Sequence, residues 1–543
     1  MNANAAVVGT DSSDGPAARA ATPLALTLAY HERSKHRLDR YAAGPGPLDW
    51  DAQPDPFRCW NWTQYLKLPR QPVELPATWA ELNAERPAAP ITLANLGTLL
   101  RLAVAVTAWK SYEGAKWPLR AHPSSGNLHP TETYVIAHWV EGLADGLYHY
   151  QARHHCLEWR AGEGTLSERP GLWLGFSSIH WREAWKYGER AFRYCQLDLG
   201  HVLAAVSYAA AVLGWRPRLL ALGPAQVAAT LGLDRAEDFA GVEAEEPDVL
   251  LAIELPGTVT DAPPTEWGEW SGAPSLLDPR PMYHWPVIDE VAEATRGAPP
   301  DMGMPDAIVA SHCSARTSSA KQSIAPAVPA AQVILNRRSA QAFDGQSVMP
   351  HAVFRRLLAA LLPGGAPIWS LWPGPARVHP VILVHRVEGL ANGLYLLPRR
   401  DAAVPALRQA LRGNFEWQPA DPELPLFRLV AARCGKTART VSCHQDIAAQ
   451  SALTFMMLAE FEGPLAEDTA AYRHLHWEAG MLGHAATLEA EAAGWRGTGI
   501  GCFFDDADHE LLGLSDSAYQ VIYHYAIGMA VDDPRLTTLP AYD

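Results

Sequence analysis

Short polar side chains gather in one stretch near residue 125. Residues 122–130 place two hydroxyls, a glycine and an amide, from Ser124 to Asn127, between Pro123 and Pro130. Such a segment can present small hydrogen-bond donors and bare backbone to the polar edge of a flat ligand. An ordinary Pro/Ser/Gly turn has the same composition, so the stretch alone does not decide between ligand binding and a turn.

Two further segments have the chemistry to hold an anion. Arg337, Arg338 and Ser339 combine two guanidinium groups with a hydroxyl, which suits a phosphate, although paired arginines are also common on solvated surfaces. Residues 496–501 carry alternating glycines, among them Gly497 and Gly499, which would let the backbone approach a ligand closely. Their spacing fits neither a Walker loop nor a dinucleotide-binding fingerprint.

The chain repeats itself. Residues 140–148 return as 387–395 with a single difference, Asp145 against Asn392. The Asx-Gly pair in each copy is a hairpin-turn dipeptide, which gives the phrase itself a structural role. Residues 191–216 also align with 471–496 without a gap. These repeats predict an internal duplication, in which two unequal halves can share one site.

Composition bounds the organisation of the chain. A length of 543 residues predicts roughly two to four domains. Residues 1–23 are rich in Ala, Ser, Gly and Asp and are expected to be a disordered tail, because they lack the basic start and apolar core of a signal peptide. We expect a first domain at 24–257, a Pro/Gly/Ala/Ser-rich linker at 258–330 and a second domain at 331–543.

Charge and cysteine usage exclude several classes of protein. The net charge of −15 argues against a general nucleic-acid-binding surface. No run of about 18 apolar residues is present, so no membrane span is expected. Seven cysteines without a C-x-x-C pair favour a reduced, cytoplasmic protein and no zinc site.

Apolar periodicity predicts the main elements. Helices are expected at 93–109, 189–213, 352–361 and 469–493, and strands at 134–137, 248–253, 381–385 and 521–531. The elements do not alternate in a regular βαβ order. We therefore expect an α+β fold in which a sheet packs against long helices.

Taken together, these residues resemble the nitroreductase superfamily of flavoproteins. The first half is most similar to its SagB-type branch, which oxidises azolines to azoles on modified peptides. The resembling segments are residues 30–36, 122–130, 146–150 and 186–194 in the first half, and 337–339, 497–501, 528 and 533–535 in the second.

The resemblance implies two fused nitroreductase-like domains, each an antiparallel-dominated sheet flanked by helices, forming an internal pseudodimer. It leaves open whether the chain dimerises again. It also implies an FMN held between the two copies. Arg337, Arg338 and Ser339 would bind the phosphate, with Arg535 as a further contact. The ring would face Ser124, Ser125 and Asn127 from one side and the backbone at Gly497 and Gly499 from the other.

Each half lacks a ligand-binding segment that the other half retains. At the place of the Ser-rich loop, residues 373–380 of the second half carry no Ser and no Asn. At the place of the glycine segment, residues 216–220 of the first half carry no Gly. The residues that remain belong to one interface of the family's dimer. We therefore expect a single intact FMN site.

Lys186 and Tyr187 match a Lys-Tyr pair of the azoline-oxidising relatives. Aromatising an azoline removes a hydride and a proton, and a lysine whose pKa is lowered by burial or by Arg190 and Arg193 could accept that proton. Neighbours on a helix point in different directions, so we expect both side chains to reach one ligand only at a helix start. A surface lysine beside a packed tyrosine is the alternative interpretation.

The sequence thus predicts an FMN-dependent dehydrogenase of a small heterocyclic or peptide substrate. Two alternatives stay open. One is an NAD(P)H-dependent reductase of nitro or quinone compounds, which would use the same flavin in the opposite direction. The other is a non-catalytic flavin-binding or partner subunit.

Overall fold

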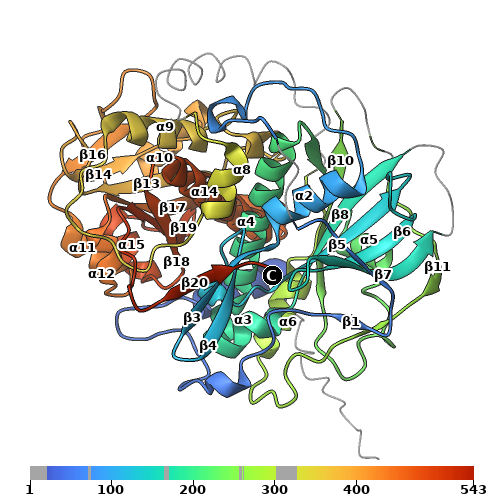
Figure 1. The fold of residues 1–543 in the computed structure, drawn as a ribbon. Helices are drawn as coiled ribbons and strands as arrows, with labels where there is room; N and C mark the ends of the chain where they lie inside the picture. The colour runs from blue at the N-terminus through green and yellow to red at the C-terminus, as the bar shows by residue number, and fades with distance from the viewer. Residues whose placement is uncertain are drawn as a thin grey trace, which may run out of the picture.

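Two long helices run side by side through the middle of the molecule (Figure 1). In this computed structural model, which describes residues 21–70, 75–163, 170–255, 260, 262–300, 327–372 and 374–542, helix α4 spans Ala191–Val212 and α14 spans Ala471–Ala492. Both helices are buried along almost their whole length. The predicted helices 189–213 and 469–493 are confirmed to within two residues at each end.

The two helices cross at a pair of glycines. A Cβ atom added to Gly200 would lie 2.3 Å from the carbonyl oxygen of Trp477, and one added to Gly480 would lie 2.2 Å from that of Leu197. Real Cβ atoms do not approach backbone so closely, so the helices pack at this distance only because both positions lack a side chain.

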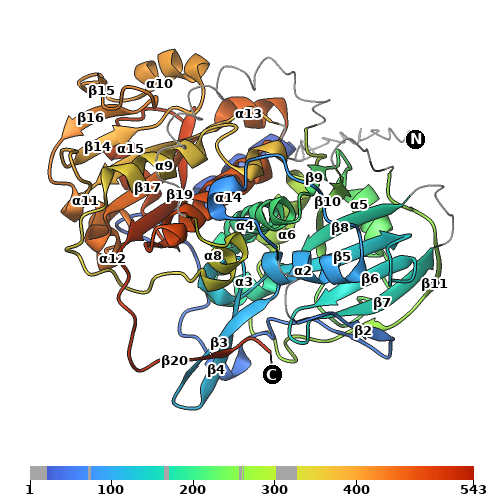
Figure 2. The same ribbon diagram turned by 45° about the horizontal axis from the view of Figure 1, so that its top comes forward.

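An antiparallel sheet lies on each side of this helix pair (Figure 2). The first runs in the order β11 (Trp267–Trp270), β7 (Cys156–Glu163), β6 (Gly146–Gln151), β5 (Thr131–His138), β8 (Gly171–Ser178), β10 (Glu246–Glu254), β9 (Arg216–Leu219), with β2 (Tyr65–Lys67) also on β7. The second runs β15 (Gln418–Pro419), β16 (Phe427–Ala431), β14 (Gly393–Leu396), β13 (Val378–Val384), β17 (Leu453–Glu460), β19 (Tyr519–Gly528), β18 (Arg496–Ile500).

The two sheets share one topology. In each, the strand that follows the central helix (β9 or β18) forms one end of the sheet and pairs with the last long strand (β10 or β19). This common order is what an internal duplication produces. The predicted fold class, two nitroreductase-like α+β domains with antiparallel sheets, is confirmed.

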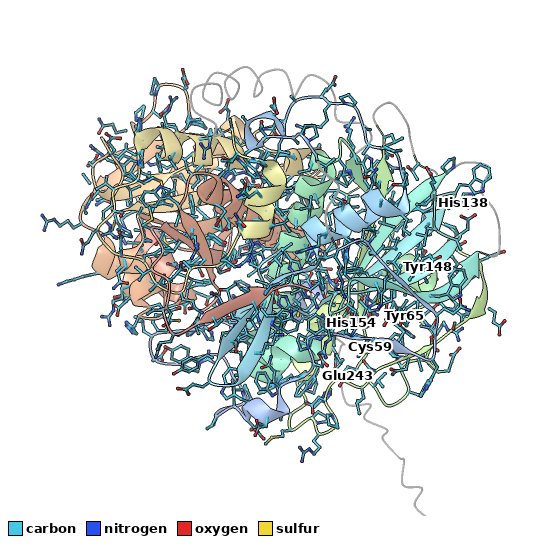
Figure 3. All side chains as sticks on the ribbon, in the orientation of Figure 1. Cys59, Tyr65, His138, Tyr148, His154 and Glu243 are labelled. Atoms are coloured by element: carbon cyan, nitrogen blue, oxygen red, sulfur yellow. The ribbon has the colours of Figure 1, made fainter. Side chains whose placement is uncertain are left out.

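The repeated phrase has the same structure in both halves. The Tyr148 hydroxyl donates to the Ala144 carbonyl at 2.7 Å, and the Tyr395 hydroxyl donates to the Ala391 carbonyl at 2.7 Å. Tyr148 lies among the outer strands of the first half (Figure 3). The phrase forms a longer loop between β5 and β6 than a two-residue turn, and Gly142 adopts the positive φ of +82° within it. The repeat is therefore structural and lies outside the site.

The remaining elements cover these layers. They are the helices α1 (Pro23–Arg33), α2 (Leu93–Ala103), α3 (His180–Tyr187), α5 (Pro224–Leu231), α6 (Pro286–Ala294), α8 (Ala330–Asn336), α9 (His351–Leu361), α10 (Val404–Ala410), α11 (Gly435–Val441), α12 (Asp446–Gln450), α13 (Glu462–Glu467) and α15 (Asp505–Leu512), short 3₁₀ turns, and the strand pair β1 (Trp60–Asn61) with β12 (Ala273–Pro274).

The C-terminal segment of the second half crosses to the first half. Strand β20 (Thr537–Pro540) pairs with β3 (Val106–Tyr112), which in turn pairs with β4 (Ala115–Arg120) (Figure 2). The Tyr542 hydroxyl donates to the Ala152 carbonyl at 2.8 Å. This crossing adds backbone hydrogen bonds to the helix contact that already joins the halves.

Two sequence predictions need correction. The helix predicted at 93–109 ends at Ala103, because the β-branched and aromatic residues from Val106 onward pair as β3. The range 258–330 is not a plain linker in its described part, since β11 joins the first sheet and α6 packs on α1. Most of the predicted tail, residues 1–20, lies outside the described residues.

One helical stretch, His180–Val212, is long and apolar enough to cross a membrane by length and composition alone. In the part of the chain that the structure describes, 94% of its apolar window is buried inside the protein. Its apolar character therefore belongs to the core contact with α14.

The glycine crossing makes a testable prediction. Gly480→Ala should lower the free energy of unfolding by about 2 kcal/mol or more, because the new methyl group meets backbone that cannot move away. Urea denaturation of the variant and the wild type measures this loss. Gly463→Ala is the matched control, since a Cβ there meets nothing within 4 Å. Equal stability of the two variants would contradict the packing argument.

Candidate functional site

A cavity of about 720 Å³ opens between the two halves. The first half contributes residues 122–127, together with Tyr187, Tyr194 and Asp198. The second half contributes residues 336–341 and 498–502, together with Tyr523. The cavity therefore brings together most of the predicted site residues: Ser124, Ser125, Asn127, Arg337, Arg338, Ser339 and Gly499.

The arginine arm follows α8. Arg337 is buried, and its guanidinium donates to the carbonyls of Arg120 at 2.9 Å and Ala121 at 2.8 Å in the first half. Arg338 donates to the Thr107 hydroxyl at 3.2 Å. Within the described residues neither guanidinium forms an ion pair with a carboxylate. Both guanidinium groups thus hydrogen-bond to neutral oxygens, and the Glu491 carboxylate, which also lines the cavity, opposes the lowering of their pKa values.

Burial, together with the neighbouring Arg337, lowers the pKa of Arg338 to about 10. Burial likewise lowers the pKa of Arg337. Such shifts mean that the charged forms lack compensation in this environment. An anion bound between these groups would supply that compensation, with Ser339 nearby as a hydroxyl donor.

The Ser-rich loop is fixed by its own polar groups. Ser125 donates its backbone N–H and its hydroxyl to Asp198, each at 2.9 Å. The Ser124 hydroxyl accepts from His129 N–H at 2.8 Å. The Asn127 amide donates to the Pro118 carbonyl at 2.9 Å, and its oxygen lies 3.0 Å from His129 Nε2. The polar side chains expected to face a ligand therefore also hold the loop in shape.

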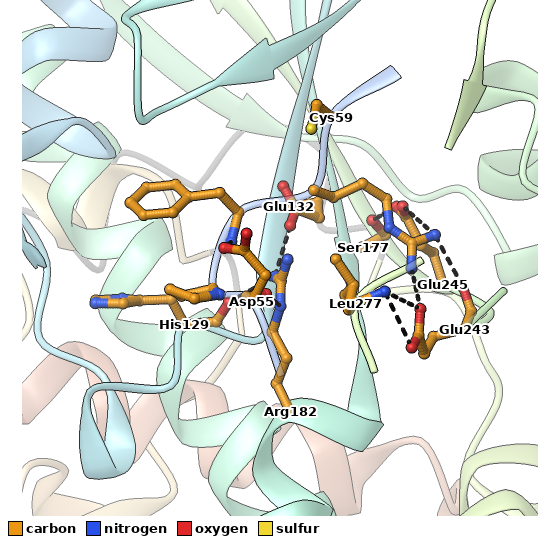
Figure 4. Close-up of polar contacts among 12 residues, drawn as sticks. Asp55, Cys59, His129, Glu132, Ser177, Arg182, Glu243, Glu245 and Leu277 are labelled. Carbon is orange, nitrogen blue, oxygen red and sulfur yellow. Dashed lines mark hydrogen bonds and ion pairs between the residues drawn. The ribbon is translucent and has the colours of Figure 1, made fainter. Parts of the chain in front are cut away.

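A buried arginine supports the same loop from below (Figure 4). Arg182 on α3 donates to the His129 carbonyl at 2.8 Å and forms an ion pair with Glu132 at 2.5 Å. It also donates to the Asp55 carbonyl at 3.0 Å. The loop is thus attached to α3, which carries Lys186 and Tyr187 at its other end.

Lys186 and Tyr187 converge on the loop at Gly126. A Cβ atom on Gly126 would lie 2.5 Å from the Tyr187 hydroxyl and 3.1 Å from Lys186 Nζ. The expected helix start is wrong: the pair lies at the C-terminal end of α3, and both side chains still reach Gly126 from there. Tyr187 lines the cavity, whereas Lys186 lies beside Gly126 at its margin.

Burial lowers the pKa of Lys186 and raises that of Tyr187 well above its usual value. The expectation that Arg190 and Arg193 lower the pKa of Lys186 is wrong. Both arginines form ion pairs with Asp505, at 2.9 Å and 2.7 Å, and burial alone lowers the lysine pKa. The arrangement favours a lysine that accepts a proton and a tyrosine that keeps its own.

The glycine segment is an edge strand rather than a turn. β18 pairs with β19 on one side only, and the Gly497 carbonyl accepts from Ala340 N–H at 3.1 Å on the other. Because backbone groups alternate along an antiparallel strand, the N–H of Gly499 also faces away from β19, toward the cavity. A Cβ on Gly497 would meet Thr487 Oγ1 at 2.6 Å, so Gly497 packs on α14 and does not line the cavity.

Arg535 does not join the other predicted residues. Its guanidinium pairs with Asp533 at 2.7 Å, is 69% exposed and lies 5.6 Å from the centre of the Tyr112 ring. It does not line the cavity. The ion pair with Asp533 holds this arginine away from the cavity, and the spacing of residues in the sequence does not predict that pairing.

Residues that carried no motif also line the cavity. Tyr194 and Tyr523 lie against Gly501 and Gly499, where a Cβ would be 2.4 Å and 2.0 Å from their rings or hydroxyls. Asp198 could have been found from the alignment of the two halves, where it matches Glu478. Tyr194 ends the resembling segment 186–194, whereas Tyr523 had no comparable signal in the sequence.

Comparison with known proteins agrees with this geometry. The Nitroreductase family model matches residues 334–529. The second half of this chain is a nitroreductase-family domain. A solved structure assigned as a nitroreductase from Anabaena variabilis superposes with a TM-score of 0.66 over 93% of this chain and 99% of its own, at 22% identity. Both halves therefore share the fold of that structure.

Two curated relatives match shorter stretches. The trifolitoxin-processing protein TfxB of Rhizobium leguminosarum bv. trifolii is 34% identical over 112 residues, which cover 18% of this chain and 30% of TfxB. MJ1384 of Methanocaldococcus jannaschii, assigned as a nitroreductase, is 28% identical over 137 residues, which cover 23% of this chain and 66% of that protein. The chain thus covers less than two thirds of either relative.

In the second half, the acid that matches Asp198 is surrounded by other side chains. Glu478, which matches Asp198, accepts from the Arg377 N–H at 3.1 Å and forms a buried ion pair with Arg399. The Arg399 guanidinium in turn lies 4.2 Å from the centre of the Trp369 ring. Leu219 on β9 stands where Gly499 stands on β18. The acid that matches Asp198 is therefore paired with a protein cation.

A buried acid beside the site predicts a pH effect on stability. Burial raises the pKa of Glu183 well above its usual value, and neither carboxylate oxygen has a hydrogen-bond partner among the described residues. A raised folded-state pKa means that the acid penalises the fold increasingly as pH rises above the unfolded value.

Glu183→Gln should therefore raise the melting temperature by roughly a few degrees at pH 8 and by less at pH 5. Differential scanning fluorimetry at both pH values measures the difference. Glu290→Gln, at an exposed position of α6, is the control and should change little at either pH. A pH-independent effect of Glu183→Gln would rule out this origin.

Proposed function

We propose that this chain binds one FMN in the cavity between its halves and dehydrogenates a heterocycle, in the manner of SagB-type azoline dehydrogenases. The single observation that carries the proposal is the meeting of the Ser-rich loop of the first half with the arginine arm of the second in one cavity of about 720 Å³. The loop and the arm come from opposite sides of the α4–α14 contact.

The residues present fit the cofactor. Arg337 and Arg338, which face the cavity without carboxylate partners in the described chain, would hold the phosphate together with Ser339. Tyr194, Tyr523 and Ile500 offer apolar and aromatic surface to a flat ring. The N–H of Gly499 faces the cavity from the edge of the sheet and can donate to a polar atom of the ring.

FMN, when bound, accepts a hydride equivalent from the substrate. The chain itself handles the proton. Lys186 Nζ, with its pKa lowered by burial, accepts a proton from a substrate carbon or nitrogen placed near Gly126. The Tyr187 hydroxyl stays protonated and donates a hydrogen bond that orients the heterocycle.

Peptide-linked substrates are favoured by one relative. TfxB is named as a trifolitoxin-processing protein, and its similarity supports a substrate that is part of a modified peptide. The runner-up is an NAD(P)H-dependent nitro or quinone reductase, for which Lys186 and Tyr187 would have no required role. A third possibility is a flavin-binding partner subunit without activity of its own.

The cofactor proposal predicts a stoichiometry. The purified chain should be yellow, with one FMN per chain by absorbance, because in the second half the acid that matches Asp198 is paired with Arg399 and the Ser-rich loop is missing. Arg338→Ala should weaken FMN binding on the order of tenfold or more, since it removes a charge from the phosphate site. Arg433→Ala, at an exposed position, is the matched control. Two FMN per chain would refute the single-site proposal.

The lysine proposal predicts a pH profile. Lys186→Met should reduce turnover of an azoline-containing peptide by about 100-fold or more, because general base catalysis is lost. In the wild type, turnover should rise with pH through a pKa below the usual lysine value, and the variant should lose this rise. Lys436→Met, at an exposed position of α11, is the control.

Undiminished turnover with bound FMN would remove Lys186 from the mechanism. Rapid bleaching of the flavin by NADPH, together with turnover that does not depend on Lys186, would favour the reductase instead. A colourless protein without activity would favour the partner subunit.

A further inference from the structure

Two cysteines meet at the wall of the cavity. Cys502 follows β18 and lines the cavity, and Cys443 lies in the turn between α11 and α12. Backbone and side-chain hydrogen bonds hold these two segments together: Phe504 N–H donates to the Val441 carbonyl at 2.8 Å, and Gln445 Nε2 donates to the Cys502 carbonyl at 3.0 Å. Both thiols are free and partly exposed.

The turn that carries Cys443 is strained. Cys443 and His444 have φ values of +50° and +59°, in the left-handed region that residues with a Cβ seldom adopt. The preceding Ser442 is anchored, with its hydroxyl 3.0 Å from His524 Nδ1. The anchored turn keeps Cys443 beside the segment of Cys502.

A third segment supplies a histidine. His36, after α1, pairs with Phe504 through a β-bridge, and its carbonyl accepts from Asp505 N–H at 3.1 Å. His36 Nδ1 accepts from Ala42 N–H at 2.9 Å, so the proton of the neutral ring lies on Nε2. The His36 ring hydrogen-bonds to Cys502, and Nε2–H is the donor left for this contact.

The two thiols are unequal. The Cys443 thiol hydrogen-bonds to Cys502, which lowers the pKa of Cys502 and raises that of Cys443. His36 and the nearby Arg190 also favour the Cys502 thiolate, whereas burial opposes it. Tyr41 hydrogen-bonds to Cys443, and the nearby Asp505 carboxylate also raises the pKa of Cys443. Cys502 is therefore the nucleophile of the pair, and Cys443 is positioned to resolve its oxidised form.

We propose that Cys443 and Cys502 form a redox-active dithiol, which a hydroperoxide oxidises to a disulfide in the cavity wall. The Cys502 thiolate attacks a peroxide oxygen, so that an S–O bond forms, the O–O bond breaks and hydroxide leaves. Cys443 loses its proton and attacks the Cys502 sulfur, which forms the S–S bond and releases the second oxygen as water. The two thiols lose two electrons and two protons, and hydrogen peroxide becomes two waters.

The disulfide would tie residues 501–503 of the cavity wall to the turn at 443. Gly501 packs against Tyr194 of the first half, where a Cβ would lie 2.4 Å from the ring. The bond would therefore fix the wall that faces the Ser-rich loop. The site is independent of the proposed dehydrogenase chemistry, because its oxidation needs only peroxide.

Trypsin separates the two cysteines cleanly. Cleavage after Arg439, Arg473, Arg496 and Arg535 yields peptides 440–473 and 497–535, each with one cysteine. The full-length protein is treated with a small excess of hydrogen peroxide, alkylated in denaturant and digested. Mass spectrometry should find the two peptides joined, with the loss of two hydrogen atoms, and a thiol reductant should separate them.

Reactivity of the untreated wild type gives a second measurement that needs no variant. At pH 7, iodoacetamide should modify Cys502 roughly tenfold faster than Cys59, whose pKa is raised by burial. Cys59 is the matched control because it is also partly exposed, and it lies in the first half (Figure 3). Equal rates at the two positions would overturn the assignment of Cys502 as the nucleophile.

Single variants separate the two roles. In Cys443→Ser, peroxide should leave a sulfenic acid on Cys502 that dimedone traps, and in Cys502→Ser, Cys443 should stay a thiol. Cys59→Ser should form the disulfide as the wild type does. Peptides 440–473 and 497–535 that remain separate after peroxide treatment of the folded wild type would overturn the proposal, whatever the flavin content of the sample.

Discussion

The contact between Gly200 and Gly480 is the constraint on which the rest of the structure depends. Backbone of α14 occupies the place of a side chain on α4, and the reverse holds at the same crossing. The distance between the two sheets is therefore fixed at the centre of the molecule. A cavity whose walls come from β18, α8 and the Ser-rich loop can keep its shape only if this distance does not vary.

The two crossing helices carry matching acids, one in each half, and the residues around these acids differ. In the first half, Asp198 on the central helix accepts hydrogen bonds from the Ser125 backbone N–H and hydroxyl. In the second half the matching acid, Glu478, is neutralised by the buried Arg399. A buried ion pair that is broken leaves a costly unpaired charge, so the second place cannot easily accept an anionic ligand. The two sheets keep one topology, whereas the side chains around the two matching acids differ.

Sequence reasoning recovered the parts of this arrangement that leave a periodic or repeated signal. The long helices were predicted within two residues because their apolar pattern is continuous, and the aligned glycines turned out to be the crossing point. The end of α2 was missed because the apolar pattern continues into β3 without a strong break. The proline and glycine content of residues 258–330 predicts a linker. This composition masks the short strand β11, which contains two tryptophans.

The residues of the candidate site likewise divide into those with a signal in the sequence and those without one. Residues 122–127 and 337–339 were found from composition and spacing, and the cavity unites them. Arg535 and Gly497 lie outside the cavity because local partners, Asp533 and Thr487, decide where they point. Tyr523 could not be found in advance, because a tyrosine on a buried element has no pattern that distinguishes packing from a cavity wall.

Charge explains why an acidic protein can hold an anion at its centre. The net charge of −15 belongs to the whole chain, whereas the cavity is lined by Arg120, Arg337 and Arg338 with mostly carbonyl partners. Among the acids that line the cavity, burial raises the pKa of Asp198 to about 7 and also raises that of Glu491, whereas Asp532 and Asp533 form ion pairs with Arg496 and Arg535. Screening by water is weak inside such a cavity, so the local arrangement outweighs the distant surface charge. The positive potential that a phosphate requires is therefore built from a few buried guanidinium groups, and it persists although the surface carries the opposite sign.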